Sequence, residues 1–180
     1  MTTYIGLLRA VNLGPRNKIA MSDLRGIVTG LGMQDARTLL QSGNVVFRSN
    51  LRSATKVEQL LEQALEEHLG RATDVFVRTG DELKTVIGSN PFPAFAGRDP
   101  SHLVVVFLKA PASQPAVAAL QKAIPGREEV RADGRHMYIV YPDGIGRSRL
   151  GTLPEAKIAS RGTARNWNTV LKLAALASVS

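Results

Sequence analysis

The first half of the chain alternates short apolar runs with longer amphipathic segments. Between residues 55 and 70 the apolar positions recur every three or four residues, and Thr55 with Glu58 forms a capping box, which predicts a helix ended by Gly70. A second stretch with helical spacing follows Ser22. Strand-like runs surround these helices at residues 4–8, 38–41, 45–48 and 74–78. The predicted order is βαββαβ, the ferredoxin-like split βαβ arrangement.

The second half shows a looser version of the same pattern. Residues 102–109 contain a β-branched run typical of a strand buried on both faces, and residues 113–124 have the spacing of a helix. Asp133-Gly134 is the pair that a type I′ hairpin turn requires. The remaining predicted elements are strands over 129–132 and 135–141 and helices over 154–160 and 164–177. This half is therefore expected to run βαββαα.

A stiff stretch separates the two halves. A short helix after Asp81 is predicted to stop at Asn90-Pro-Phe-Pro93, because proline lacks a backbone donor and restricts the residue before it. The sequence thus predicts an α+β protein in three parts. These are a ferredoxin-like subdomain over 1–79, a helix and proline-rich linker over 80–101, and a second α+β subdomain with C-terminal helices over 102–180.

Composition narrows the functional classes. The chain has 23 Lys+Arg against 15 Asp+Glu, a formal net charge of +8 at pH 7, which favours an anionic partner. Cysteine is absent, so disulfides and thiol catalysis are excluded. The three histidines are far apart in sequence, and we expect neither a metal site nor a cofactor. Without a signal-peptide pattern or a membrane-length apolar run, the chain is expected to be soluble and cytoplasmic.

The first candidate site is the start of the last predicted helix. With Thr163 as N-cap, Arg165 lies in the first turn, where an exposed cation opposes the helix macrodipole by about 0.3–1 kcal/mol. A bound anion would reverse that sign by accepting hydrogen bonds from the helix N-terminus and from Arg165. The alternative is that Arg165 pairs with an internal carboxylate such as Asp143 or Glu155. The residues assigned to this candidate are Arg147, Ser148, Arg149, Arg165 and Asn166.

The second candidate site is the loop before the first helix. It contains Asn12, Arg16, Asn17 and Lys18, although neither the GxxxxGK[ST] nor the GxGxxG phosphate motif occurs in the chain. A solvated basic loop is the alternative interpretation. The tight turn that follows later explains Asn44 by itself, whereas Gln41 and Ser42 are candidates for ligand contacts.

Nucleic-acid binding needs its own test, because ferredoxin-like sheets include RNA-binding domains. At the place of the aromatic-rich third strand the chain reads GNVVFR over residues 43–48, and aromatic residues total 5%. The stacking platform is absent, so any nucleic acid is expected to be bound through its backbone phosphates. No catalytic arrangement is nominated either, and the residues leave open whether the protein is an enzyme.

Several blocks carry a resemblance to a known family. They are YIGLLRAVNLG at residues 4–14, NKIAM at 17–21, QSGNVVF at 41–47 and TARNWNTVLKL at 163–173. Together they resemble the bacterial family called domain of unknown function 1697. The chain departs from that pattern with Ala20 at a usual proline and Ala164 at a frequent threonine. The resemblance implies an α+β protein with a ferredoxin-like half, and it supplies no activity.

The leading hypothesis is a binding protein for a small phosphate- or carboxylate-bearing ligand. The ligand is expected between residues 12–18, Ser148 and Arg165. Two alternatives remain: a non-specific nucleic-acid binder that contacts backbone phosphates, and an enzyme that uses the same pocket.

Overall fold

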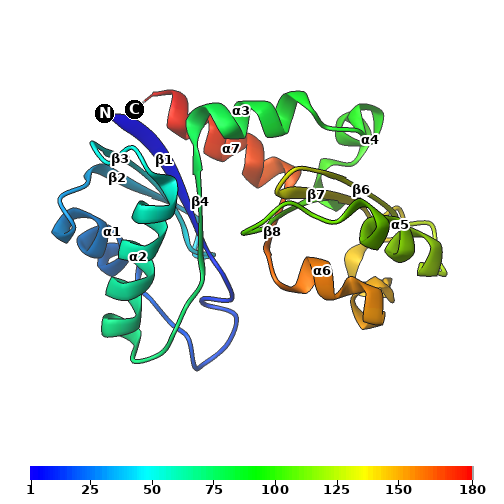
Figure 1. Ribbon diagram of the computed structural model, residues 1–180, viewed down its shortest axis with the longest axis horizontal. Coiled ribbons are helices and arrows are strands. Elements are labelled where there is room, and N and C mark those ends of the chain that lie inside the picture. Colours follow the sequence, from blue (N-terminus) through cyan, green and yellow to red (C-terminus); the bar gives the residue numbers. More distant parts are fainter. Residues whose placement is uncertain (180) are drawn as a thin grey trace. The chain divides into compact units, whose positions relative to one another are not determined.

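The computed structural model describes residues 1–179 and confirms the α+β class. Two four-stranded antiparallel sheets carry helices (Figure 1). The chain divides into unit 1, which comprises Met1–Thr85 and the chain from Lys172 onward, and unit 2, Val86–Leu171. These bounds differ from the three-part division drawn from the sequence, because the end of the last helix clusters with unit 1.

Unit 1 is built on a sheet with the strand order β2-β3-β1-β4. Its first six elements follow the predicted βαββαβ order. They are β1 (Thr2–Leu8), α1 (Met21–Gly30), β2 (Gln34–Leu39), β3 (Asn44–Ser49), α2 (Ala54–Leu69) and β4 (Val75–Thr79). Two further helices contribute residues to both units: α3 (Gly80–Gly88) and α7 (Trp167–Ser178).

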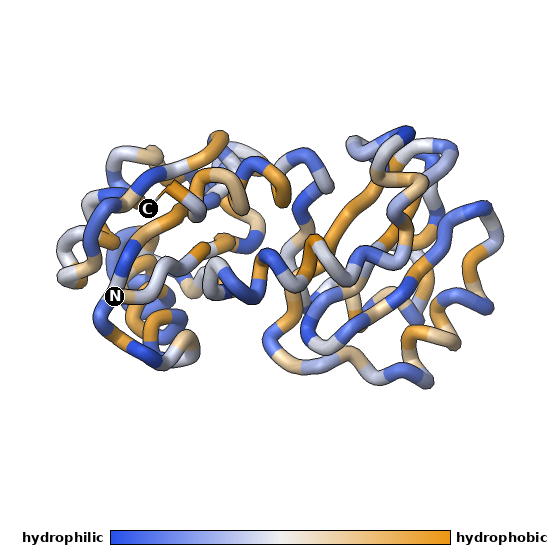
Figure 2. The backbone as a smooth tube through the Cα atoms, turned by 90° about the horizontal axis from the view of Figure 1, so that it is seen from above, coloured by the Kyte–Doolittle hydropathy of each residue, from blue (hydrophilic) through white to orange (hydrophobic). Residues whose placement is uncertain are grey.

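The core of unit 1 lies between its sheet and helices α1 and α2. Alternate strand residues, among them Tyr4, Phe47 and Val77, pack against Leu24 of α1 and Leu61 of α2. Each fully buried side chain of this kind contributes about 1.5–3 kcal/mol to stability. Figure 2 shows that hydrophobic and hydrophilic stretches alternate along the chain. The apolar runs that the sequence analysis assigned to strands therefore contribute residues to this core.

The start of α2 differs from the prediction. Ser53, and not Thr55, caps the helix, because the Ser53 hydroxyl accepts a hydrogen bond from the Lys56 N–H at 3.2 Å. Glu58 instead accepts from the N–H of Val77, 2.9 Å away on the edge strand β4. The carboxylate thus satisfies a donor that an edge strand would otherwise leave without a partner in the sheet.

Unit 2 repeats the same sheet topology, with the strand order β6-β7-β5-β8. The segment 80–101, expected to be helix and linker, contains α3, α4 (Pro93–Arg98) and most of η1 (Pro100–His102). The strands and longer helix that follow are β5 (Leu103–Phe107), α5 (Gln114–Ala123), β6 (Glu129–Asp133), β7 (His136–Val140) and β8 (Thr163–Asn166). Between β7 and β8 the chain forms η2 (Ile145–Arg147), η3 (Leu150–Thr152), η4 (Pro154–Ala156) and α6 (Lys157–Ser160).

Strand β8 overturns the prediction of a helix from residue 164. Thr163–Asn166 pairs antiparallel with β5, with Arg165 opposite Val105, and α7 begins only at Trp167. The helix cap is Asn166, whose side-chain oxygen accepts from the Thr169 N–H at 3.0 Å. The predicted βαββαα order is therefore wrong: unit 2 runs βαββαβ before the last helix.

Candidate functional site

Three loops of unit 1 meet at one end of its sheet. They are the β1–α1 loop, the β2–β3 turn and the α2–β4 loop, and the first and last lie at the lower end of this sheet in Figure 1. The main chain ties them together, since the Leu8 N–H donates to the Gly43 carbonyl at 2.8 Å and the Arg9 N–H donates to the Asp74 carbonyl at 3.0 Å. Ligand sites often lie on loops held in this way by a rigid sheet.

Asn12 acts as a clamp within this loop cluster. Its side-chain Nδ2 donates to the carbonyls of Ile19 at 3.1 Å and Gln41 at 2.6 Å, and its Oδ1 accepts from the Ile19 N–H at 2.9 Å. The backbone of Asn12 has a φ of 56°, in the left-handed region that asparagine tolerates. The Asn12 amide is thus occupied in joining two loops, and the predicted role as a ligand contact is not needed to explain it.

The β2–β3 turn is fixed by close packing against β1. A Cβ on Gly43, where φ is 78°, would lie 2.5 Å from a Val11 methyl and 2.8 Å from the Leu8 Cβ. The fully buried Asn44 donates to the Leu39 carbonyl at 2.8 Å and to the Ser42 hydroxyl oxygen at 2.9 Å. Asn44 and Ser42 therefore shape the turn, while the Gln41 side chain stays exposed.

The two basic residues of the β1–α1 loop that were predicted to contact a ligand are exposed. A buried asparagine between them is hydrogen-bonded to the start of the same loop. Arg16 and Lys18 lie on the surface. Asn17 is 9% exposed and donates from Nδ2 to the Ala10 carbonyl at 2.7 Å. Within residues 1–179 the Asn17 Oδ1 is buried and has no hydrogen-bond partner. The Arg16 and Lys18 side chains are thus exposed on a loop whose backbone is held by the buried Asn17.

A small pocket with a volume of about 250 Å³ lies beside these loops. It is lined by Arg9, Ala10, Arg71, Ala72, Thr73 and Asp74. Arg9 forms an ion pair with Asp74 at 3.2 Å, and their side chains are 42% and 53% exposed, so water screens the pair strongly. Arg71 is exposed and has no carboxylate partner in the described part of the chain. The pocket therefore combines two guanidinium groups with one carboxylate.

One residue that lines this pocket, Thr73, has a buried hydroxyl group without a hydrogen-bond partner in the described chain. The residue is 6% exposed, and its Oγ1 is buried with no hydrogen-bond partner among residues 1–179. A buried hydroxyl left in this state costs about 1–3 kcal/mol. Sequence reasoning missed Thr73, Arg9 and Arg71, because only the pairing of β1 with β4 brings the residue after β1 next to the residues before β4.

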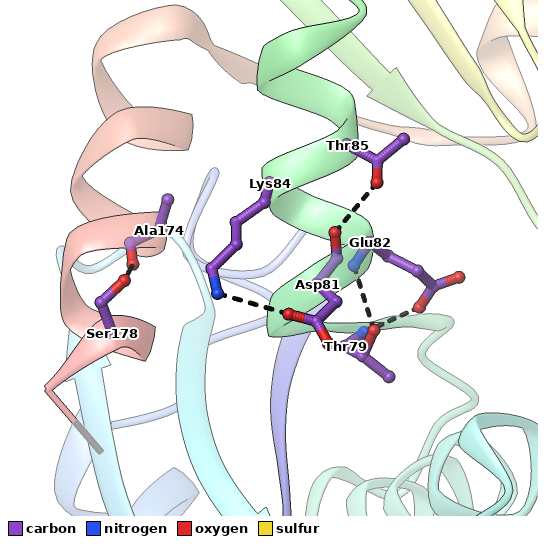
Figure 3. A network of polar contacts seen from close by, with 7 residues as sticks. All are labelled: Thr79, Asp81, Glu82, Lys84, Thr85, Ala174 and Ser178. Carbon is purple, nitrogen blue, oxygen red and sulfur yellow. Dashed lines mark hydrogen bonds and ion pairs between the residues drawn. The ribbon is translucent and has the colours of Figure 1, made fainter.

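A second pocket of unit 1, of about 290 Å³, lies at the start of α3 (Figure 3). Thr79 and Glu82 form a reciprocal cap there, with hydrogen bonds of 2.7 and 3.1 Å. Lys84 Nζ lies 3.3 Å from an Asp81 carboxylate oxygen. The two charged side chains that line this pocket neutralise each other, which makes it a weaker candidate for an ionic ligand.

In the glycine-bearing loop of unit 2, the predicted anion contact Ser148 is hydrogen-bonded to a carboxylate. The Ser148 hydroxyl donates to the Glu128 carboxylate and accepts from the Leu150 N–H at 3.1 Å. Burial, and then the nearby charge of Glu128, raise the pKa of Tyr141. Arg147 and Arg149, on the same loop, are exposed. A carboxylate bound to Ser148 disfavours an anion at that position.

Arg165 lies on β8 and not in the first turn of a helix, so the macrodipole argument for an anion is wrong. The side chain is 8% exposed, and Nη1 donates to the Thr163 hydroxyl at 2.7 Å and the Ala164 carbonyl at 2.9 Å. Burial lowers the pKa of Arg165 to about 10, which leaves it charged at neutral pH. Asp143, one alternative partner, pairs with Arg127, whose hydrogen bond lowers the pKa of Asp143.

The predicted site residues thus separate into two groups, one on each unit. Asn12, Arg16, Lys18, Gln41, Ser42 and Asn44 belong to unit 1, where the structure brings their loops together. Arg147, Ser148, Arg149, Arg165 and Asn166 belong to unit 2. Across residues 1–179, no three metal-ligating side chains gather into a cluster. None of the described helices has the length and apolar character needed to cross a membrane.

The comparisons with known proteins agree with the fold. A family described as "Protein of unknown function (DUF1697)" matches residues 1–138. Among solved structures, the chain is similar to the conserved bacterial protein SP0830 from Streptococcus pneumoniae, with 20% identity, 99% of each chain covered and a TM-score of 0.78. At this identity the similarity shows the fold alone. No curated protein matches the sequence.

Proposed function

The chain belongs to the family described as "Protein of unknown function (DUF1697)", and we propose its function from the site itself. Unit 1 binds a small phosphate- or carboxylate-bearing ligand in the pocket lined by Arg9, Arg71 and Thr73. In this proposal unit 1 is a ferredoxin-like scaffold that acts in the cytoplasm. The observation that carries the proposal is that two arginines line one small pocket together with Thr73, whose buried hydroxyl has no hydrogen-bond partner within the described chain.

The size of the pocket supports a small polar ligand. Pockets for larger organic ligands occupy about 300–1,000 Å³, whereas this one measures about 250 Å³. A guanidinium presents a planar fork of donors that matches the oxygens of a phosphate or carboxylate group. Arg9 and Arg71 supply two such forks, and the Thr73 hydroxyl gains an acceptor when a rotation about its Cα–Cβ bond turns it toward the ligand.

The existing ion pair is no obstacle to binding. Arg9 and Asp74 are both about half exposed, and such pairs contribute about 0–1 kcal/mol. A bound oxyanion can replace Asp74 as the partner of Arg9 at small cost. The exposed Arg16 and Lys18 on the neighbouring loop add attraction at longer range, which salt screens beyond about 8 Å at physiological ionic strength.

Titration calorimetry with inorganic phosphate and with acetate tests this proposal. We expect Arg71→Gln to weaken binding of the preferred anion about tenfold or more, since a hydrogen bond to a charged group contributes about 1.5–3 kcal/mol. Arg52→Gln is the matched control, because Arg52 is an exposed arginine of unit 1 outside the pocket. Equal weakening in both variants would show that only the overall charge matters, and would refute the proposal.

Nucleic-acid binding is the second candidate, and the net charge of +8 favours it. A protein that contacts backbone phosphates loses affinity steeply as salt rises, and each cation contributes a similar share. Binding of a single-stranded oligonucleotide at two salt concentrations, with Arg71→Gln and Arg52→Gln compared, separates the two functions. A steep salt dependence with equal effects of both variants would favour the nucleic-acid binder.

A further inference from the structure

We propose that unit 2 carries a second ligand site, which binds an amphipathic carboxylate: a small molecule with one carboxylate on an apolar chain. The site is the pocket lined by Leu108, Lys109, Ala110, Pro111, Ala112, Ser113, Ile158 and Arg161. Its volume of about 400 Å³ falls within the range of about 300–1,000 Å³ typical of small-molecule sites. This inference does not depend on the function proposed for unit 1.

The walls of this pocket are mostly apolar and continuous with the core. Leu108 is 6% exposed and belongs to the hydrophobic core of unit 2, against which Ala112 and Ile158 also pack. The wall is held by the main chain, because Leu108 N–H donates to the Arg135 carbonyl and Ala112 N–H to the Gly134 carbonyl, each at 2.9 Å. A fixed apolar surface of this kind favours an apolar ligand body.

The charge at this pocket has a single sign. Lys109 and Arg161 are its only charged lining residues among those described, and no acidic side chain lines it. Within residues 1–179 Arg161 has no carboxylate partner. The next residue, Gly162, has no room for a Cβ, which would lie 2.5 Å from the Phe107 carbonyl oxygen and 2.7 Å from a Val106 methyl. The backbone after Arg161 therefore packs directly against β5. This contact fixes the main chain next to the Arg161 side chain.

The end of a helix adds to the same charge. Ser113 lines the pocket and caps α5, where its hydroxyl accepts from the Ala116 N–H at 3.4 Å. The N-terminus of this ten-residue helix carries a partial positive charge. The pocket therefore combines apolar walls with positive charge at its border, and that combination is complementary to a carboxylate with an apolar tail.

Neither simpler ligand class matches both features. A hydrophilic anion such as phosphate would leave the apolar walls of the pocket against water, and a neutral apolar molecule would make no use of Lys109 and Arg161. For a carboxylate with an alkyl chain, each additional buried methylene is expected to tighten binding about fourfold. The contribution of apolar burial to the affinity and the contribution of the carboxylate charge can be separated by varying the chain length and the head group of the ligand independently.

Calorimetric titration of the full chain with sodium butyrate, hexanoate and octanoate, and with 1-octanol, tests the site. We expect affinity to rise about fourfold per methylene, and Arg161→Gln to weaken octanoate binding about tenfold while leaving 1-octanol binding unchanged. Arg149→Gln is the matched control, since Arg149 is an exposed arginine of unit 2 that does not line this pocket. It should leave octanoate binding unchanged.

A second variant tests the apolar wall. Ala110 is exposed and lines the pocket, so Ala110→Leu should fill part of the volume and weaken octanoate without affecting the melting temperature. Arg71→Gln, in unit 1, should not change octanoate binding, so failure of one site is distinguishable from failure of the other. The proposal is overturned if affinity does not depend on chain length, if inorganic phosphate matches octanoate, or if Arg161→Gln and Arg149→Gln behave alike.

Discussion

Replacing Thr73 by valine is expected to stabilise the protein and to weaken its binding of phosphate. Thr73 is 6% exposed, and its hydroxyl oxygen is buried without a hydrogen-bond partner in the described chain. Valine has nearly the same shape and exchanges the hydroxyl for a methyl group. Because an unsatisfied buried hydroxyl costs about 1–3 kcal/mol, we expect the free energy of unfolding to rise by about that amount.

The same substitution removes a hydrogen-bond donor from the pocket. A ligand that binds only the folded state stabilises it by about 2.7 kcal/mol when its concentration is a hundred times the Kd. The wild-type protein should therefore gain stability in phosphate over chloride at equal ionic strength, and Thr73→Val should gain less. A polar group that binds a ligand often lowers the stability of the free protein, so its removal is expected to raise stability and weaken binding.

Urea unfolding followed by circular dichroism, in phosphate and in chloride, measures both effects. Thr85→Val is the control, because the Thr85 hydroxyl already donates to the Asp81 carbonyl at 3.1 Å (Figure 3) and its removal should not stabilise the protein. A destabilised Thr73→Val would refute the claim that this hydroxyl is unsatisfied. A variant that retains the full response to phosphate would refute its role in binding.

Three further predictions concern other features of the fold and site. Asp74→Asn removes the carboxylate that competes for Arg9, so phosphate affinity measured by calorimetry should rise a few-fold while stability changes by less than about 1 kcal/mol; weaker binding would contradict this account. Gly43→Ala places a Cβ at φ 78° and 2.5 Å from a Val11 methyl, so the free energy of unfolding measured with urea should fall by at least about 1–3 kcal/mol; a neutral effect would contradict the packing. Burial raises the pKa of Tyr138 from 10.0 to about 12, so its contribution to stability is complete below pH 10 and is lost as pH rises through 12. Tyr138→Phe, which also removes the 2.7 Å hydrogen bond to the Val86 carbonyl, should make that alkaline loss in urea-measured stability shallower, and an unchanged slope would contradict the assignment.

The sequence predicts those parts of the fold that local pattern determines. The helical spacing of α2 depends on residues close together in the chain, and the helix occurs in the structure. The predicted hairpin also occurs, but its two turn residues are Gly134 and Arg135 and not Asp133-Gly134, because Asp133 pairs with His136 at the end of the ladder. Strand β8 was missed because its four residues continue into α7 without a break in pattern, and pairing with β5 decides their conformation. Such tertiary pairing overrides local propensity, and it moved Arg165 from a helix turn to a buried strand position.

The candidate site was harder to predict for a related reason. Asn12 was singled out as a candidate ligand contact, but a sequence pattern does not show its hydrogen bonds to Ile19 and Gln41. The pocket residues Arg9 and Arg71 look like ordinary surface cations, because they become neighbours only through the pairing of Leu8 with Val75. Motif reading therefore singled out the β1–α1 loop, but it did not single out Arg9 and Arg71, which line the pocket beside that loop.

Mapping the backbone amide shifts of the protein by NMR during a phosphate titration tests the central claim most directly. The account predicts saturable shifts concentrated at Arg9 and Ala10 and from Arg71 to Asp74, which together border the pocket. Shifts spread evenly over exposed lysines and arginines, or saturable shifts confined to other loops, would contradict it.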